Sequence, residues 1–163
     1  MELEFKPVVA GDIDRLRPFY GLRPNKTCDS VFLDSFLWKD YYHVQCAVSE
    51  GRAVLWLMEK DGQVSTAMPL CREDLPYFFQ QMVDYFSGVL HKPFYISLAD
   101  EEAVQCLNLD PALFEVEEQV DLKDYLYSGE ELRKLEGKKF VKKRNHLNGF
   151  KRTYEGRYEY RRL

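Results

Sequence analysis

A group of cationic and polar side chains near the C-terminus is the part of the sequence best suited to chemistry. From Lys138 to Leu163 there are ten lysines and arginines and two glutamates, a net charge of +8. The preceding residues carry thirteen basic and twenty-five acidic side chains, a net charge of −12. An acidic body followed by a basic segment indicates an anionic partner, and Lys and Arg are the side chains that bind phosphate.

The basic segment is expected to form an amphipathic helix that positions these side chains. At about 100° per residue, one stripe is apolar and would pack on the body; it holds Phe140, Leu147, Phe150 and Tyr154. The remaining polar surface is the predicted phosphate- or substrate-binding surface, which consists of Lys138, Lys139, Lys142, Arg144, Asn145, His146, Gly149 and Arg152. Gly149 would let a ligand approach the backbone closely. An ordinary solvated helix face is the alternative interpretation.

Other motifs that carry chemistry are missing from the sequence. Its four cysteines, Cys28, Cys46, Cys71 and Cys106, lack metal-type pairing, and His43 and His91 lack neighbouring ligands, so we expect no metal site. No G-x-S-x-G motif is present, and the catalytic residues stay unassigned. Reduced, buried thiols would suit a cytoplasmic protein.

The length and the apolar runs bound the architecture. A chain of 163 residues is long enough for one well-cored domain, and its 45% hydrophobic content argues against disorder. The longest strictly apolar run, 53–58, is far shorter than the ~20 residues of a membrane helix. We therefore expect a cytoplasmic location, with the inner membrane surface as a peripheral site.

Hydrophobic periodicity predicts an α+β domain. Asp61-Gly62 is typical of a hairpin turn between two strands, and Ser128 with Glu131 forms a capping box that starts a helix. The predicted elements, in order, are a strand at 3–9, a helix from Gly11, a helix capped by Asp29, strands at 43–49, 53–59 and 63–70, a helix at 73–90, a strand at 94–98, a short helix after Asp100, a strand at 114–122 and the helix capped by Ser128.

This order resembles the GNAT (N-acetyltransferase) fold over residues 1–122, a mixed sheet with helices on both faces. The segments Asp124-Tyr125-Leu126-Tyr127, Leu135-Glu136-Gly137-Lys138-Lys139 and 143–150 are similar to the signature of the DUF2156 family. That family comprises bacterial proteins related to the C-terminal domain of phosphatidylglycerol lysyltransferases. Its members resemble two GNAT-like halves in tandem.

The resemblance implies a division of the chain and a function. Residues 1–122 would be a GNAT-like N-terminal half, 123–157 a capped helix with the basic connecting helix, and 158–163 the start of a missing second half. The implied activity is acyl or aminoacyl transfer from an aminoacyl-tRNA donor to a lipid or cell-wall acceptor, with this half inactive alone. The alternative is a non-catalytic module that binds tRNA or anionic lipid headgroups. In a third interpretation, the basic segment merely binds the acidic body.

The acyl carrier of GNAT enzymes is where the sequence departs from the resemblance. In those enzymes, a Gly-rich loop after the fourth strand offers backbone N–H groups to the pyrophosphate of coenzyme A. Here the junction at 70–76 contains no glycine, carries Glu73 and Asp74, and loses a donor at Pro76. We therefore expect this half to bind no coenzyme A and to use no other cofactor.

Overall fold

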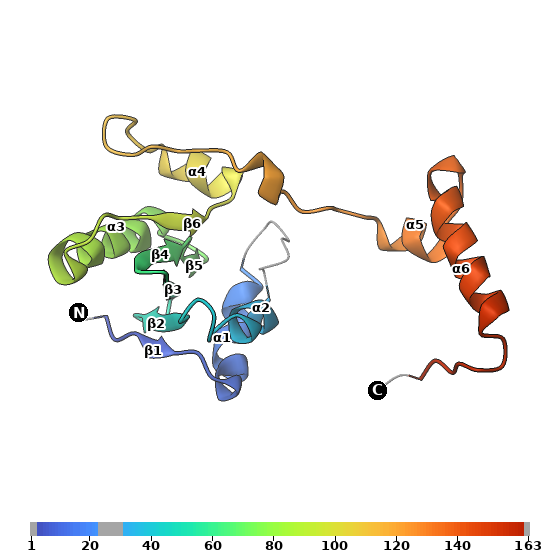
Figure 1. Cartoon of the computed structure of the whole chain (residues 1–163). Helices are drawn as coiled ribbons and strands as arrows, with labels where there is room; N and C mark the ends of the chain where they lie inside the picture. Colours follow the sequence, from blue (N-terminus) through green and yellow to red (C-terminus); the bar gives the residue numbers. More distant parts are fainter. Residues whose placement is uncertain (1–2, 23–30, 162–163) are drawn as a thin grey trace. The chain divides into compact units, whose positions relative to one another are not determined.

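The computed structural model describes residues 3–22 and 31–161, and it divides the chain into two compact units. The N-terminal unit covers residues 1–119 and the C-terminal unit residues 120–163. Figure 1 shows the elements of both units in the colours of the sequence. Each unit is described by itself below.

The N-terminal unit is built on a mixed sheet. Its strands follow the order β1-β2-β3-β4-β6, and β5 pairs with the first residues of β3. The pairs β1–β2, β2–β3 and β3–β4 are antiparallel, whereas β4–β6 is parallel, as expected for two strands joined by a helical crossover. The strands are β1 (Lys6–Pro7), β2 (Gln45–Ser49), β3 (Ala53–Lys60), β4 (Gln63–Ala67), β5 (Leu70–Cys71) and β6 (Ile96–Leu98).

Strand β3 is central because its two sets of alternating side chains enter different cores. Val54 and Trp56 join the cluster formed with α1 and α2, while Ala53 and Leu55 join the cluster formed with α3. These helices therefore cover opposite faces of the sheet (Figure 1). The helices of this unit are α1 (Ile13–Tyr20), α2 (Phe32–Leu37), α3 (Leu75–Tyr85) and α4 (Glu101–Leu107).

Helix α3 is the predicted helix at 73–90, but it ends earlier and continues in a different geometry. Asp74 precedes it in the left-handed conformation, at φ 59°. The last turns, Phe86–Leu90, form a π-helix (η2), in which Phe86 is fully buried. Asp100 caps α4 as predicted, because its side chain accepts a hydrogen bond of 2.8 Å from the Ala103 N–H.

Two strand predictions are wrong. Residues 114–119 are irregular and Val120–Leu122 forms a short 3-10 turn (η3), since the alternating side chains of Val116, Val120 and Leu122 find no partner strand and stay exposed. The strand predicted at 63–70 is interrupted at Met68-Pro69, because proline offers no N–H to the sheet. The chain then pairs with β3 as the separate strand β5. Asp29, the predicted cap of α2, lies outside the described residues.

The C-terminal unit contains two helices. Helix α5 (Gly129–Lys134) starts at the predicted capping residue, where Ser128 Oγ accepts from the Glu131 N–H at 3.4 Å. A 3-10 turn, η4 (Lys138–Phe140), leads directly into α6 (Val141–Thr153), the predicted basic helix. Among the described residues of both units, no helix is long and apolar enough to cross a membrane.

Candidate functional site

The bend between α5 and α6 is held by one arginine and one buried ring. Leu135 ends α5 at φ 52°, and Gly137 follows at φ 83°, a conformation that glycine adopts without strain. Arg144 Nη1 donates to the carbonyl oxygens of Leu135 and, at 2.9 Å, of Gly137. Phe140, 4% exposed, is buried beneath this bend. Arg144, one of the predicted site residues, thus satisfies backbone carbonyls at the end of α5.

A second predicted cation also has a partner inside the unit. Lys139 Nζ lies 2.7 Å from Glu131 Oε1, and it lies 5.1 Å from the centre of the Phe140 ring. Lys134 pairs with Glu130 at 2.8 Å in the same way. The Lys139–Glu131 pair joins the η4 turn to α5, whereas the Lys134–Glu130 pair lies within α5.

The other predicted side chains point to solvent along α6. Lys138, Lys142 and Arg152 are exposed, and they form no ion pair with any residue that the structure describes. Asn145 and His146 are exposed between them, and Gly149 is half-buried. A Cβ added at Gly149 would meet no atom within 4 Å, so the backbone there is open on its outer side. The structure therefore brings together three exposed cations, an amide and an imidazole on the η4 turn and α6.

An open depression lies at the C-terminal end of α6. It has a volume of about 600 Å³ and is lined by Asn148, Lys151, Arg152, Glu155, Gly156 and Tyr158. Only Arg152 among these was predicted as a site residue. Lys151 could have been found from its position beside Arg152, whereas Gly156 and Tyr158 enter because the chain turns back after the helix, at φ 70° for Gly156.

The apolar stripe of α6 is buried only at its start. Leu147, Phe150 and Tyr154 are 42–46% exposed, whereas Phe140 is buried. Within the unit, Phe150 contacts the rings of Tyr154 and Tyr158, each at 5.0 Å between centres. Tyr125 is 89% exposed, and the Lys143 ammonium lies 5.5 Å from the centre of the Tyr127 ring.

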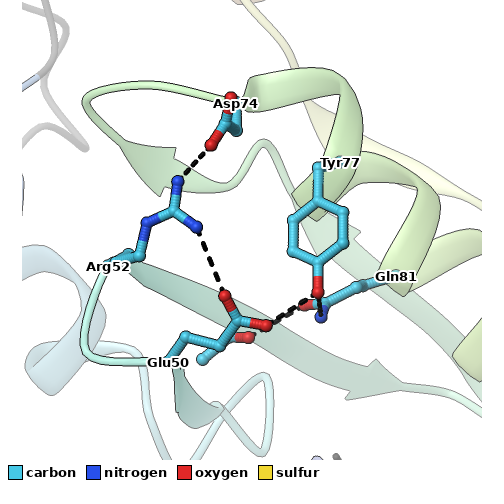
Figure 2. A network of polar contacts seen from close by, with 6 residues as sticks. Glu50, Arg52, Asp74, Tyr77 and Gln81 are labelled. Atoms are coloured by element: carbon cyan, nitrogen blue, oxygen red, sulfur yellow. Dashed lines mark hydrogen bonds and ion pairs between the residues drawn. The ribbon is translucent and has the colours of Figure 1, made fainter.

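In the N-terminal unit, the junction before α3 is occupied by a network of polar side chains (Figure 2). Arg52 contacts Asp74 and lies 3.3 Å from Glu50, and Tyr77 donates a 2.7 Å hydrogen bond to Glu50. Gln81 extends the network by donating to the Tyr77 hydroxyl at 3.0 Å, and its amide oxygen accepts from Ser49 Oγ at 2.9 Å. The hydrogen bond to Asp74 raises the pKa of Arg52, and the one to Glu50 raises the pKa of Tyr77.

This network fixes the turn after β2 against the first turns of α3. Of its members, only Asp74 was singled out from the sequence. Arg52 and Glu50 lie more than twenty residues away from Asp74 in the sequence, and no local pattern indicates that the fold brings them together. The arrangement places the Asp74 carboxylate and the Arg52 guanidinium in contact at the glycine-free junction before α3.

The three described cysteines of the N-terminal unit differ in exposure, and none belongs to a cluster of potential metal ligands. No group of three or more His, Cys, Asp or Glu side chains is arranged to hold a metal ion within the described part of the chain. Cys46 is buried and burial raises the pKa of its thiol, Cys71 is half-buried, and Cys106 is exposed. The expectation of buried thiols is therefore wrong for Cys106, and Cys28 lies outside the described residues.

Comparisons with known proteins identify the fold and the family. Comparison with curated protein sequences found no match. A crystal structure of a conserved protein of unknown function from Bacteroides thetaiotaomicron VPI-5482 is similar, with a TM-score of 0.78 and 24% identity. The match covers 93% of this chain and 51% of that one, so the chain spans about half the length of its structural neighbour.

The fold prediction is confirmed: the chain contains a mixed sheet with helices on both faces, and its similarity to the solved structure extends over 93% of the chain. The model of the family described as "Phosphatidylglycerol lysyltransferase, C-terminal" matches residues 21–163. That match includes the segments at 124–127, 135–139 and 143–150 on which the resemblance was based. The chain belongs to the phosphatidylglycerol lysyltransferase C-terminal family.

Proposed function

We propose that this chain is the N-terminal, GNAT-like half of an acyl- or aminoacyl-transferase of the phosphatidylglycerol lysyltransferase kind, and that α6 binds phosphate groups of its donor or acceptor. Membership of the family supports transferase chemistry. The length of the structural neighbour, about twice that of the match, supports a second half of similar size. The chain alone would be inactive, because proximity catalysis in a groove between two halves requires both.

The single observation that carries the phosphate-binding role is the exposed group of cations on η4 and α6. Lys142 and Arg152 are ten residues apart in α6, which places them on neighbouring parts of its surface, and Lys138 precedes them in the η4 turn. Phosphate contacts position a nucleic acid or a headgroup without reading its identity, so this group suits tRNA and anionic lipid equally. The corresponding locations are the cytoplasm and the inner surface of the membrane.

The test measures binding of unfractionated tRNA and of phosphatidylglycerol vesicles over a range of salt concentrations. Neutralising three phosphates should give a log–log slope of about −2 to −3, from −0.7 to −0.9 per phosphate. Replacing Lys138, Lys142 and Arg152 with Gln should flatten that slope. The melting temperature should change little, because exposed charges contribute little to stability.

A matched variant controls for net charge. Three exposed cations of the N-terminal unit are Arg17, Arg72 and Lys92. Replacing them with Gln changes the net charge by the same amount as the triple variant of η4 and α6 does. This control should keep the wild-type slope. Equal loss of binding in both variants would make the effect one of net charge, and absence of salt-sensitive binding in the wild type would contradict the proposal. A longer protein that contains both halves should also transfer an acyl or aminoacyl group. If it binds tRNA and vesicles in a salt-sensitive manner but transfers no such group, the result would favour the alternative, a non-catalytic module that binds polyanions.

A further inference from the structure

Three aromatic rings and one ammonium group form a compact cluster on the surface of the N-terminal unit. The three residues, Trp38, Tyr41 and Tyr42, follow α2 directly. The ring centre of Trp38 lies 5.7 Å from that of Tyr41 and 6.0 Å from that of Tyr42, and the two tyrosine ring centres are 4.7 Å apart. The planes of Tyr41 and Tyr42 are nearly perpendicular, at 88°. We call these three residues the ring cluster. None of the sequence motifs or the family match assigns a role to it.

The ring cluster faces solvent instead of the core. Trp38 and Tyr41 are 50% and 52% exposed, and Tyr42 is 36% exposed. A contiguous patch of exposed apolar side chains often marks a recognition site, and the three rings of the cluster contact one another. The buried cluster of this region is complete without them, since Phe32, Trp56 and Tyr20 supply its rings.

The backbone holds the ring cluster in place. The N–H groups of Tyr41 and Tyr42 both donate to the Trp38 carbonyl, at 3.1 and 3.0 Å. The Glu59 N–H donates to the Tyr42 carbonyl at 2.8 Å and so ties the segment to the end of β3. These bonds order the backbone that carries the rings, so a ligand that binds to the rings need not order this segment.

The ring cluster already holds a cation. Lys60 Nζ lies 4.4 Å from the centre of the Tyr41 ring and 5.6 Å from that of Tyr42. The face of an aromatic ring carries partial negative charge and attracts cations at such distances. Lys39, the other nearby lysine, is paired with Asp40 at 2.7 Å. Lys60 is attached at the end of β3, next to the Asp61-Gly62 turn, so its flexible side chain can leave the rings without any change in the backbone.

We propose that the ring cluster is a binding site for a primary alkylammonium group, and that Lys60 occupies it until the ammonium of a ligand takes its place. The chemical class follows from the resident group, which is itself a primary alkylammonium. The acidic character of residues 1–119, with twenty Asp and Glu against ten Lys and Arg, attracts such a cation. This inference is independent of the proposed function, because it concerns the other unit and is tested on other residues.

The experiment titrates n-butylammonium chloride into the Lys60→Gln variant at constant ionic strength, with NMR detection of the tryptophan indole N–H groups. The chain has two tryptophans, and Trp56 is buried, so its signal serves as an internal reference for that of Trp38. Lys60→Gln should show a saturable shift of the Trp38 signal, and the wild type should bind several-fold more weakly because Lys60 competes. Lys92→Gln, which removes an exposed lysine elsewhere, should behave like the wild type.

Two controls separate cation binding from a general apolar effect. Neutral n-butanol should give no saturable shift, and adding Tyr41→Leu to Lys60→Gln should remove the response to n-butylammonium. The proposal is overturned if folded Lys60→Gln shows no saturable shift, if butanol reproduces it, or if the wild type binds equally well.

Discussion

The two units of this chain obtain their structure by different means. The N-terminal unit buries three apolar clusters around its sheet, and it carries ten basic against twenty acidic residues. The C-terminal unit carries thirteen basic against seven acidic residues, and among its described residues only Phe140 is a buried hydrophobic side chain. Its fold depends on a capped helix start, the Lys139–Glu131 pair and the Arg144 hydrogen bonds. The candidate phosphate-binding surface thus lies on the unit with the smaller core, as is common for ligand-binding elements.

The largest expected effects on stability come from removing a buried ring in one unit or the other. Phe86→Ala should destabilise the N-terminal unit by about 3–5 kcal/mol, since a fully buried ring is replaced by a cavity. Phe140→Ala should unfold the α5–α6 bend and leave the N-terminal unit unchanged. Both tryptophans belong to the N-terminal unit, so tryptophan fluorescence in urea follows that unit alone. Tryptic cleavage within 138–152, identified by the masses of the fragments, reports the C-terminal unit.

A particular result would break this comparison. If Phe140→Ala moved the urea midpoint of the tryptophan signal as far as Phe86→Ala does, the two units would unfold as one cooperative structure. Faster tryptic cleavage within 138–152 at an unchanged urea midpoint is the expected pattern.

A smaller effect of opposite sign is expected at Gly149. A Cβ added there meets no neighbour within 4 Å, and alanine is the better helix former. Gly149→Ala should therefore stabilise α6 by about 1 kcal/mol and raise the helical signal in circular dichroism. Gly156→Ala is the matched control, because φ is 70° there and alanine would be strained. Loss of helicity in Gly149→Ala would mean that this position packs against a partner.

No effect at all is expected from coenzyme A on the N-terminal unit. Its pyrophosphate would have to approach Glu73 and Asp74 and displace Arg52 from the Asp74 carboxylate. Calorimetric titration with acetyl-coenzyme A should give no saturable heat in the variant with Lys138, Lys142 and Arg152 replaced by Gln, which lacks the candidate phosphate-binding cations of the C-terminal unit. Micromolar binding would show that anion binding is not confined to the C-terminal unit, whereas binding that arises only in Glu73→Gln/Asp74→Asn would identify the carboxylates as its barrier.

The sequence predicted best those features that local patterns determine. The apolar run of β3, the 3.6-residue period of α3 and the Ser128 cap each depend on neighbours within a few residues. The strand expected at 114–122 failed because alternation shows only that a strand could form, and pairing requires a partner elsewhere in the chain.

The candidate site was predictable in composition but not in detail. Charge and helical period located the basic helix, yet they gave no sign that Lys139 and Arg144 have partners within the unit. The Arg52–Asp74 contact and the Lys60–Tyr41 contact each join separate elements of the fold. Such contacts arise from the path of the chain, which local periodicity does not contain.

The π-helical turn at the end of α3 has a consequence for insertions and deletions. A π-helix carries an extra residue relative to an α-helix, and such turns arise as single-residue insertions into an α-helix. Deleting one residue within Phe86–Leu90 would restore α-helical geometry and leave the buried face of Leu75–Tyr85 in register. The same deletion inside Leu75–Tyr85 would rotate one part of the helix by about 100° and turn Phe78 or Met82 away from the sheet. Length variation in this helix should therefore be tolerated at its C-terminal end alone.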